Sequence, residues 1–453
     1  MPAHIPDPSS HPDPSRNPEP APSRAPSTGR PLILSNALDA AGRNTADLAT
    51  DVLAVVVLGA TAAQMGLLNA LGTLAFLVLG IPIGVLVDRS PTVRLLLASG
   101  LVRAGLLASL VLAWSLDGLT LLHLYAVATL AGTAAVVVET TQTAIAPRAV
   151  GVSGVSRLVS RMQSAESVIS LVVPALAGVL VALTGAGPTL AVAAALTAFA
   201  ALVVLRLRLA APEQPTVAAD EDPTGSAGEE PEAATTALAR FLREGRLGWS
   251  TLRERRTLWR LTLGSMLINL GLAVHSAVEV VLVLRELDLG ATVLGLLVSA
   301  GGVGGLLGSL VAVPLADRLG VPRVLRGSVL LLAPVAALTL TALLDPHRAT
   351  AWLLAGSFCW GVAIVTYNVL LAGIAAELTP TELMGRVSAT RRTLTMGIVP
   401  VGGIAGGLLA DQAGLVATIT AWIVLNAIGA AVVATTSFPR DQSANGPAPY
   451  NPA

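Results

Sequence analysis

Three ionisable residues recur at four-residue intervals in an apolar stretch near the N-terminus. Asp39, Arg43 and Asp47 occupy positions i, i+4 and i+8, which a helix places on one face. In a bilayer core each would cost at least ~2.5–3.5 kcal/mol, so each needs a partner or a role. Arg43 can neutralise one carboxylate and leave the other free to titrate. The spacing therefore indicates a proton or substrate relay, with a structural ion triad as the alternative.

A second polar set lies in a later apolar stretch. His275 and Glu279 are four residues apart and can pair on one helical face. A histidine beside a carboxylate titrates near neutral pH and suits proton exchange. Asn269 precedes this pair on the same stretch, and the alternative role is closure of an outer gate. Glu139, in a third apolar stretch, suits either coupling or gating.

One late stretch combines aromatic and polar side chains. Trp360, Tyr367 and Asn368 are spaced to line a cavity, although core packing is the alternative for Trp360. Arg103 lies in a further stretch, near enough to its predicted inner end to snorkel toward the interface.

Composition places these groups in a membrane. Of 453 residues, 53% are hydrophobic and 12% charged, and the mean hydropathy is +0.73. The apolar stretches have the length that crosses a bilayer as helix, and their backbones must satisfy their own hydrogen bonds there. The chain predicts twelve spans, at about 32–58, 63–87, 93–114, 121–145, 164–183, 189–207, 261–284, 291–315, 321–344, 351–376, 389–409 and 416–436.

Several functional classes are excluded by what the chain lacks. A formal net charge of zero gives no argument for nucleic acid. All 28 basic residues are arginine, so a nucleotide-driven pump with a phosphate-loop lysine is not expected. No catalytic carboxylate pair with a nucleophile and no metal-ligand spacing occurs. We therefore expect no enzyme activity, no cofactor and no metal.

The chain divides into five regions. Residues 1–31 form a Pro-rich, disordered tail, and residues 32–208 a first bundle of six helices. Residues 209–257 form a linker with an Arg-rich amphipathic helix. Residues 258–437 repeat the six-helix bundle, and residues 438–453 form a second tail.

The arginines predict the orientation. Arg285 and Arg348 are the only arginines in the odd-numbered gaps between spans, whereas the even-numbered gaps are rich in arginine. By the positive-inside rule, both termini and the linker face the cytoplasm. We expect a multi-pass protein of the inner (plasma) membrane, and a monomer because one chain holds both halves.

A short motif follows the second span and returns after the eighth. Its members in the first copy are Gly84, Asp88, Arg89 and Arg94, and in the second copy Asp317, Arg318 and Arg323. The two copies are 229 residues apart. The first copy resembles the signature loop of the major facilitator superfamily, with Ser90-Pro91-Thr92 in place of the usual basic portion.

The segment 378–388, which contains Gly385 and Arg386, is similar to the enterobactin-exporter and macrolide-efflux branch of that superfamily. The resemblance implies an all-α integral membrane fold of two pseudo-symmetric six-helix bundles, with alternating access and proton antiport. It also implies that Asp88 and its loop lock a cytoplasmic gate. An aspartate at one helix end can accept hydrogen bonds from a neighbouring helix N-terminus.

These inferences predict a proton-coupled exporter of a small hydrophobic or amphipathic molecule, such as an antibiotic, a secondary metabolite or a siderophore. An uptake symporter for a small nutrient is a second reading, although the helices offer few of the amides and aromatic residues that sugar sites use. A non-transporting membrane receptor or scaffold is a third, and it would leave both motif copies without a use.

Overall fold

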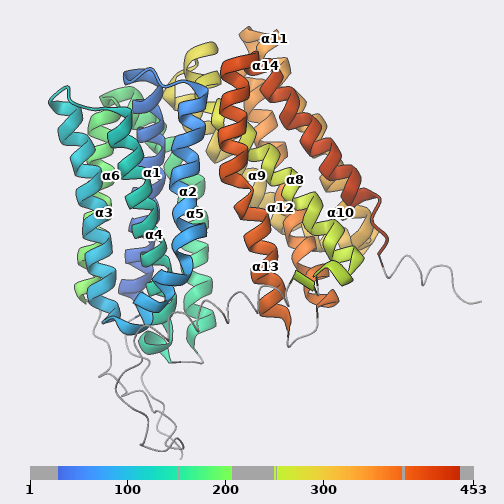
Figure 1. Cartoon of the computed structure of the whole chain (residues 1–453), viewed down its shortest axis with the longest axis horizontal. Helices are drawn as coiled ribbons and strands as arrows, with labels where there is room; N and C mark the ends of the chain where they lie inside the picture. Colours follow the sequence, from blue (N-terminus) through green and yellow to red (C-terminus); the bar gives the residue numbers. More distant parts are fainter. Residues whose placement is uncertain (1–28, 152–153, 207–248, 251, 380–382, 439–453) are drawn as a thin grey trace, which may run out of the picture.

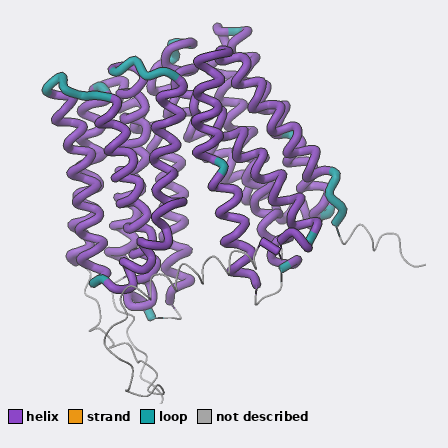
Figure 2. The backbone as a smooth tube through the Cα atoms, viewed as in Figure 1, coloured by secondary structure: helices purple, strands orange, loops and turns teal. Residues whose placement is uncertain are grey.

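The computed structural model describes residues 29–151, 154–206, 249–250, 252–379 and 383–438, and these form helices joined by short connections (Figures 1 and 2). Figure 1 shows two bundles side by side. The first contains α1 (Gly29–Val52), η1 (Leu53–Val57), α2 (Ala62–Arg89), α3 (Thr92–Ser115), α4 (Leu121–Val150), α5 (Val155–Thr184), α6 (Ala186–Val203) and η3 (Val204–Arg206).

The second bundle repeats this order. It contains α8 (Arg256–Val281), η4 (Leu282–Glu286), α9 (Gly290–Leu319), α10 (Val321–Leu330), α11 (Leu332–Leu344), η5 (Pro346–Arg348), α12 (Ala349–Leu378), α13 (Met384–Gly397) and α14 (Val399–Ala434).

The helices fit the twelve predicted spans. Within the described residues, nine segments are long and apolar enough to cross a membrane. The last of these, Met384–Ala434, covers two spans, because Gly414 breaks α14 with φ 87°. α1 and α2 provide the first two spans, and α1 is the one that carries the buried charges. The two-bundle, all-helical prediction is confirmed.

Several helices are longer than the sequence predicted. The segment 147–161 was expected to be a basic loop, but α4 continues to Val150 and α5 begins at Val155. Likewise α9 extends to Leu319, so Asp317 and Arg318 lie in its last turn rather than in a loop. Polar residues ended the predicted spans, yet a helix can continue past the hydrocarbon core into water.

Parts of the predicted domain plan lie outside the described residues. These are nearly all of the first tail (1–31), most of the linker with its amphipathic helix (209–257), and all but the start of the second tail (438–453). Just after the gap at residues 207–248, the Trp249 and Trp259 rings meet edge to face, with centroids 5.3 Å apart.

The first helix of each bundle ends in the same irregular turn. α1 passes into a π-helical turn at Leu53–Val57, and α8 into one at Leu282–Glu286. The two turns are 229 residues apart, the spacing of the sequence motif. π-turns of this kind are rare and occur often at functional sites. The internal repeat therefore extends to local backbone geometry.

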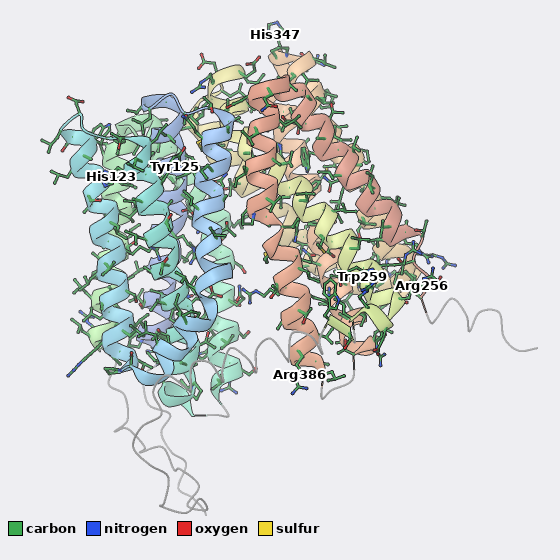
Figure 3. All side chains as sticks on the ribbon, viewed as in Figure 1. His123, Tyr125, Arg256, Trp259, His347 and Arg386 are labelled. Carbon is green, nitrogen blue, oxygen red and sulfur yellow. The ribbon has the colours of Figure 1, made fainter. Side chains whose placement is uncertain are left out.

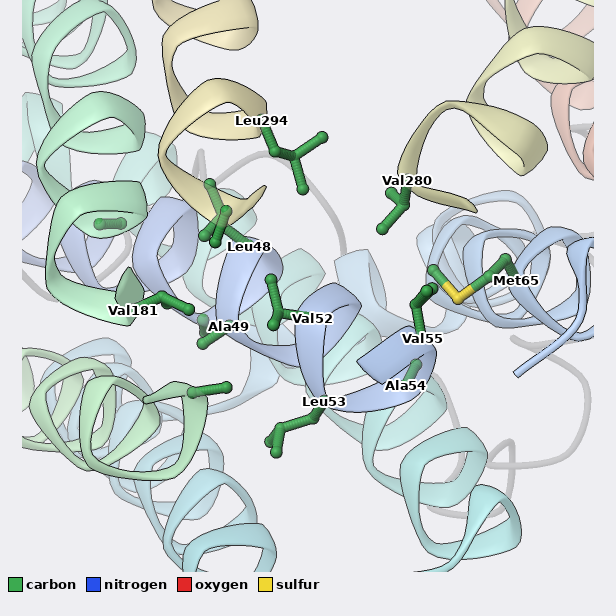
Figure 4. Packing of buried hydrophobic residues seen from close by; sticks show 14 of the residues in the cluster. Leu48, Ala49, Val52, Leu53, Ala54, Val55, Met65, Val181, Val280 and Leu294 are labelled. Atoms are coloured by element: carbon green, nitrogen blue, oxygen red, sulfur yellow. The ribbon is translucent and has the colours of Figure 1, made fainter. Parts of the chain in front are cut away.

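The two bundles meet along α2 with α14 and along α5 with α9, and their apolar contact includes these turns. A cluster of buried apolar side chains, including Val52 and Val55 of the first bundle and Val280 and Leu294 of the second, joins them (Figure 4). Gly66 of α2 packs against the backbone of Gly403 in α14, where a Cβ atom would overlap the Gly403 carbonyl. We call this region, with Thr61, Arg285 and Asp411, the closed end. Toward the opposite end, the ribbons of α2 and α13 diverge (Figure 1).

Candidate functional site

The charged face of α1 is held by two arginines. Arg103 of α3 is 3% exposed and donates from Nη1 to both carboxylate oxygens of Asp39, at 2.8 and 3.1 Å. It does not snorkel to the interface as its position suggested, because a buried carboxylate lies within its reach. Arg43 lies 3.8 Å from Asp39 and donates from Nη2 to Glu166 of α5 at 2.5 Å. Asp39 and Arg43, two members of the ion triad considered as the alternative to a relay, thus belong to a network across α1, α3 and α5 that does not include Asp47.

This pairing leaves other carboxylates of the first bundle without an ion-pair contact, although Arg43 and Arg103 still attract Asp47 at longer range. A cavity of about 510 Å³ is lined by α1, α2, α3 and α4, and Asp47, Asp51 and Glu139 lie on its wall. Within the described residues, the side chains of Asp47, Asp51 and Glu139 make no hydrogen bond or ion pair. The two arginines on the same wall, Arg43 and Arg103, are already bound to Glu166 and Asp39. The cavity is therefore acidic.

A neighbouring cavity of about 370 Å³ continues along the same helices. Asn36, Asp39, Arg43, Glu139 and Glu166 lie on its wall. Asn36 donates from Nδ2 to Gln142 of α4 at 3.1 Å. Because Arg43 and Glu139 line both cavities, the two spaces share one polar wall.

The polar groups continue across the bundle interface. Asp51 lies close enough to Glu279 of α8 for the two carboxylates to interact electrostatically. Glu279 Oε2 is 4.0 Å from His275 Nε2, so the predicted pair on α8 forms. Asn69 of α2 donates from Nδ2 to the Ser276 carbonyl at 3.5 Å, joining α2 to α8 at the same depth. Ionisable groups of both bundles thus gather at one level.

The second bundle has a partly open cavity of its own. A cavity of about 190 Å³ is lined by α8, α9, α11, α12 and α14, with Trp360, His275 and Glu279 on its wall. The His275 ring is stacked on Trp422 of α14, with ring centroids 3.8 Å apart and planes 9° apart. The predicted residues His275, Glu279 and Trp360 therefore meet at one site.

The other predicted pathway residues lie elsewhere. Tyr367 is 1% exposed, and its hydroxyl is 2.8 Å from that of Ser265. Asn269 donates from Nδ2 to the Thr395 carbonyl at 3.0 Å, which ties α8 to α13. Asn368 is exposed. The structure brings none of these three to the cavities described above.

The motif residues lie at the end opposite the closed end. Arg94, Asp317, Arg318, Arg323, Gly385 and Arg386 are exposed. Figure 3 shows Arg386 and His347 at opposite ends of the molecule. The side chains of Gly84, Asp88 and Arg89 lie outside the described residues, although their backbone completes α2. The gating role of this motif stays a prediction.

Sequence reasoning missed three residues that the packing brings to the site. Glu166 binds Arg43, Trp422 stacks on His275, and Asp411 binds the start of α2. An acid within a predicted span was a signal for Glu166, whereas Asp411 lies in the gap between the last two predicted spans. No spacing linked either to its partner, because each contact joins helices far apart in the chain.

Metal binding finds no support in the donor set. Within the described residues, no group of three or more histidine, cysteine, aspartate or glutamate side chains could hold a metal ion.

Solved structures share the fold at low identity. The crystal structure of the nucleoside transporter NupG matches with a TM-score of 0.62 and 15% identity, over 90% of this chain and 97% of that chain. A bacterial homologue of the human lysosomal transporter Spinster, inward-facing and unoccupied, matches at 0.63 and 15%, over 90% and 96%. A bacterial homologue of the iron transporter ferroportin, inward-facing, matches at 0.62 and 17%, over 90% and 98%.

Among curated proteins, no sequence matches significantly. The repeat seen in the motif and in the π-turns agrees with the family comparison, which matches the two halves separately. The Major Facilitator Superfamily model fits residues 32–282 and again 261–452. With twelve spans in two bundles around charged cavities, the chain belongs to the Major Facilitator Superfamily of membrane transporters.

Proposed function

We propose that this transporter exports a small hydrophobic or amphipathic molecule in exchange for protons. One observation carries the proposal: Asp47 and Asp51 line a cavity in which both arginines are already bound to other carboxylates. A carboxylate without a cation in a low-dielectric site tends to be neutralised by a proton. Such a group can take up a proton in one state and release it in another.

The route crosses from one bundle to the other. Asp47 and Asp51 are one turn apart on α1, and Asp51 interacts with Glu279 on α8. Glu279 in turn faces His275. Rocking of the bundles changes the separation of Asp51 and Glu279, and with it the repulsion between their charges. Proton binding is thereby linked to the conformational state, as exchange requires.

By the positive-inside rule, the arginine distribution favours a topology with the closed end outside the cell. In this topology the bundles are joined at the extracellular side, and the cavities are reached from the cytoplasm. This is the state in which an exporter collects its cargo. Asp88 and its loop, with segment 384–397 opposite, would then form the cytoplasmic gate that closes in the other state.

The direction and class of cargo rest on two further points. The segment 378–388 is similar to the enterobactin-exporter and macrolide-efflux branch. The cavity of the second bundle has mainly apolar and aromatic walls, which suit a hydrophobic group. The protein would then contribute to antibiotic resistance or to release of a secondary metabolite.

Everted membrane vesicles with an acid interior test the proposal. Erythromycin, enterobactin and ethidium are added in turn, and a pH-sensitive dye reports proton exit. At least one compound should release protons from wild-type vesicles. Asp47→Asn and Glu279→Gln should each reduce this release about tenfold or more.

The matched control is Asp117→Asn, at an exposed turn away from the cavities. Asp117 has φ 53°, a conformation that asparagine tolerates, so release should not change. Release that is equal in wild type, Asp47→Asn and Glu279→Gln would contradict the relay. Accumulation of cargo without any need for the gradient would contradict proton exchange.

A further inference from the structure

The cavity of the second bundle is walled mainly by apolar side chains. Leu272, Leu297, Val335 and Leu353 come from four different helices, and Trp360 and Trp422 add two indole rings. Its volume is about 190 Å³, which suits a fragment with one or two rings rather than a whole drug-sized molecule. The cavity is therefore suited to a small ring compound, or to the ring-bearing end of a larger ligand.

The aromatic part of this wall is fixed in position. Trp422 is 5% exposed and is stacked on the His275 ring. Gly271 leaves room for it, since a Cβ atom there would lie 3.1 Å from Trp422 Cδ1. The Trp360 ring leans on Trp422 at 51°, with centroids 5.1 Å apart. A rigid aromatic wall binds a flat ring at little entropic cost.

Glu279 is the one acid on this mainly apolar wall, which also carries His275, Thr339 and Ser357. The Glu279 side chain is 32% exposed, and its ion-pair partner within the described residues is His275, at 4.0 Å. His275 Nδ1 is buried and has no hydrogen-bond partner in the described part of the chain. The carboxylate is thus incompletely neutralised beside two indole rings. An ammonium group gains from both, through the charge pair and through the cation–π interaction.

We propose that this cavity, lined by Trp360, Trp422 and Glu279, is a subsite for the ring end of an aromatic amine. The ring lies against Trp360, and the ammonium group pairs with Glu279. This assignment rests on the proposed export function and narrows its cargo to amphipathic amines. Because Glu279 also belongs to the proposed proton route, cargo and proton compete for one carboxylate.

Equilibrium dialysis of the purified, full-length protein in detergent tests the subsite. The probe is radiolabelled tryptamine. The competitors keep the indole ring but differ in charge: tryptophol is neutral, and indole-3-acetate is negatively charged. Tryptamine should bind at least about tenfold more tightly than tryptophol, and indole-3-acetate should not compete.

Two variants separate the ring from the charge. Trp360→Leu should weaken the binding of both tryptamine and tryptophol by about tenfold, and that of tryptamine somewhat more, because tryptamine also loses a cation–π contact. Glu279→Gln should weaken tryptamine by a similar factor and leave tryptophol unchanged, which abolishes the preference. A general loss of packing would weaken both ligands in both variants, so it would not produce this difference between Trp360→Leu and Glu279→Gln.

Further variants guard against misfolding. Gly356 lines the cavity, and a Cβ atom there would lie 3.6 Å from its nearest neighbour, an ordinary contact. Gly356→Ala should therefore fold and yet weaken both ligands. Gly373→Ala is its control on the same helix, with nothing within 4 Å and no place on the cavity wall.

Any of three results would overturn the subsite: no saturable tryptamine binding, equal affinity for tryptamine and indole-3-acetate, or unchanged binding in Trp360→Leu and Glu279→Gln. The dialysis contains no membrane gradient, so it is independent of the proton-exchange assay. Proton release by another cargo, together with failed tryptamine binding, would refute the subsite and leave the transport proposal in place.

Discussion

The carboxylate of Asp411 in α14 binds the first turn of α2, and Thr61 is its closest partner. Thr61 Oγ1 donates to Asp411 Oδ2 at 2.6 Å, and the Ala62 amide donates to Oδ1 at 3.1 Å. A helix N-terminus presents free amides and a partial positive charge, so an aspartate is favoured there. The contact joins the two bundles at the closed end. It has the geometry that the sequence motif suggested for Asp88 at the opposite end.

Asp411→Asn should weaken the closed end. The amide loses the charge that the helix terminus favours, and hydrogen bonds to charged groups contribute about 1.5–3 kcal/mol. We expect the outward-open population to rise about tenfold. Labelling of Met65→Cys, a buried closed-end position, by a membrane-impermeant maleimide in a Cys359→Ser background measures this. The neighbouring Gln412→Asn is the control. If the labelling rate is the same in Asp411→Asn and in the parent, Asp411 does not hold the closed end.

Arg103→Leu should destabilise the protein by about 3 kcal/mol, because the buried Asp39 charge then keeps only Arg43, which lies 3.8 Å away and is hydrogen-bonded to Glu166. Thermal unfolding in detergent measures the change. Adding Asp39→Asn to Arg103→Leu should restore part of the loss, since the uncompensated charge is gone. The control Arg94→Leu removes an exposed arginine and should change stability little. Equal losses in the single and double variants would show that packing, not charge, is decisive at this site.

Glu166→Gln should affect transport more than stability. The Arg43 and Glu166 side chains are 38% and 30% exposed, and such partly exposed pairs contribute about 1 kcal/mol or less. Without Glu166, Arg43 is free to neutralise Asp47, one turn along α1. We expect little change in thermal unfolding but several-fold slower cargo-driven proton release. A large loss of stability with normal proton release would reverse this assignment.

The sequence was most informative for features that depend on a single helix or on the internal repeat. Apolar length predicted the spans, and the spacing of Asp88 and Asp317 predicted a repeat that Leu53 and Leu282 also follow. His275 and Glu279 pair as their spacing on one helix requires. Local periodicity is sufficient for such features.

Contacts between different helices could not be predicted from the spacing of residues along one helix. Asp39 pairs with Arg103, and Thr61 with Asp411, across 64 and 350 residues of chain. Which faces meet is decided by how whole helices pack, and glycines such as Gly66 and Gly403 decide how closely they approach. The acidic cavity follows from pairings of this kind, because Glu166 binds Arg43, the arginine that the sequence had placed beside Asp47.

The most direct test of proton exchange uses purified protein in liposomes with an acid interior and an enclosed pH dye. Cargo identified in the vesicle assay is added outside. The account predicts that cargo enters while protons leave, and that Asp47→Asn and Glu279→Gln lose both movements together, whereas Asp117→Asn keeps both. Cargo entry with no proton movement, or with unchanged proton movement in the two relay variants, would contradict the account.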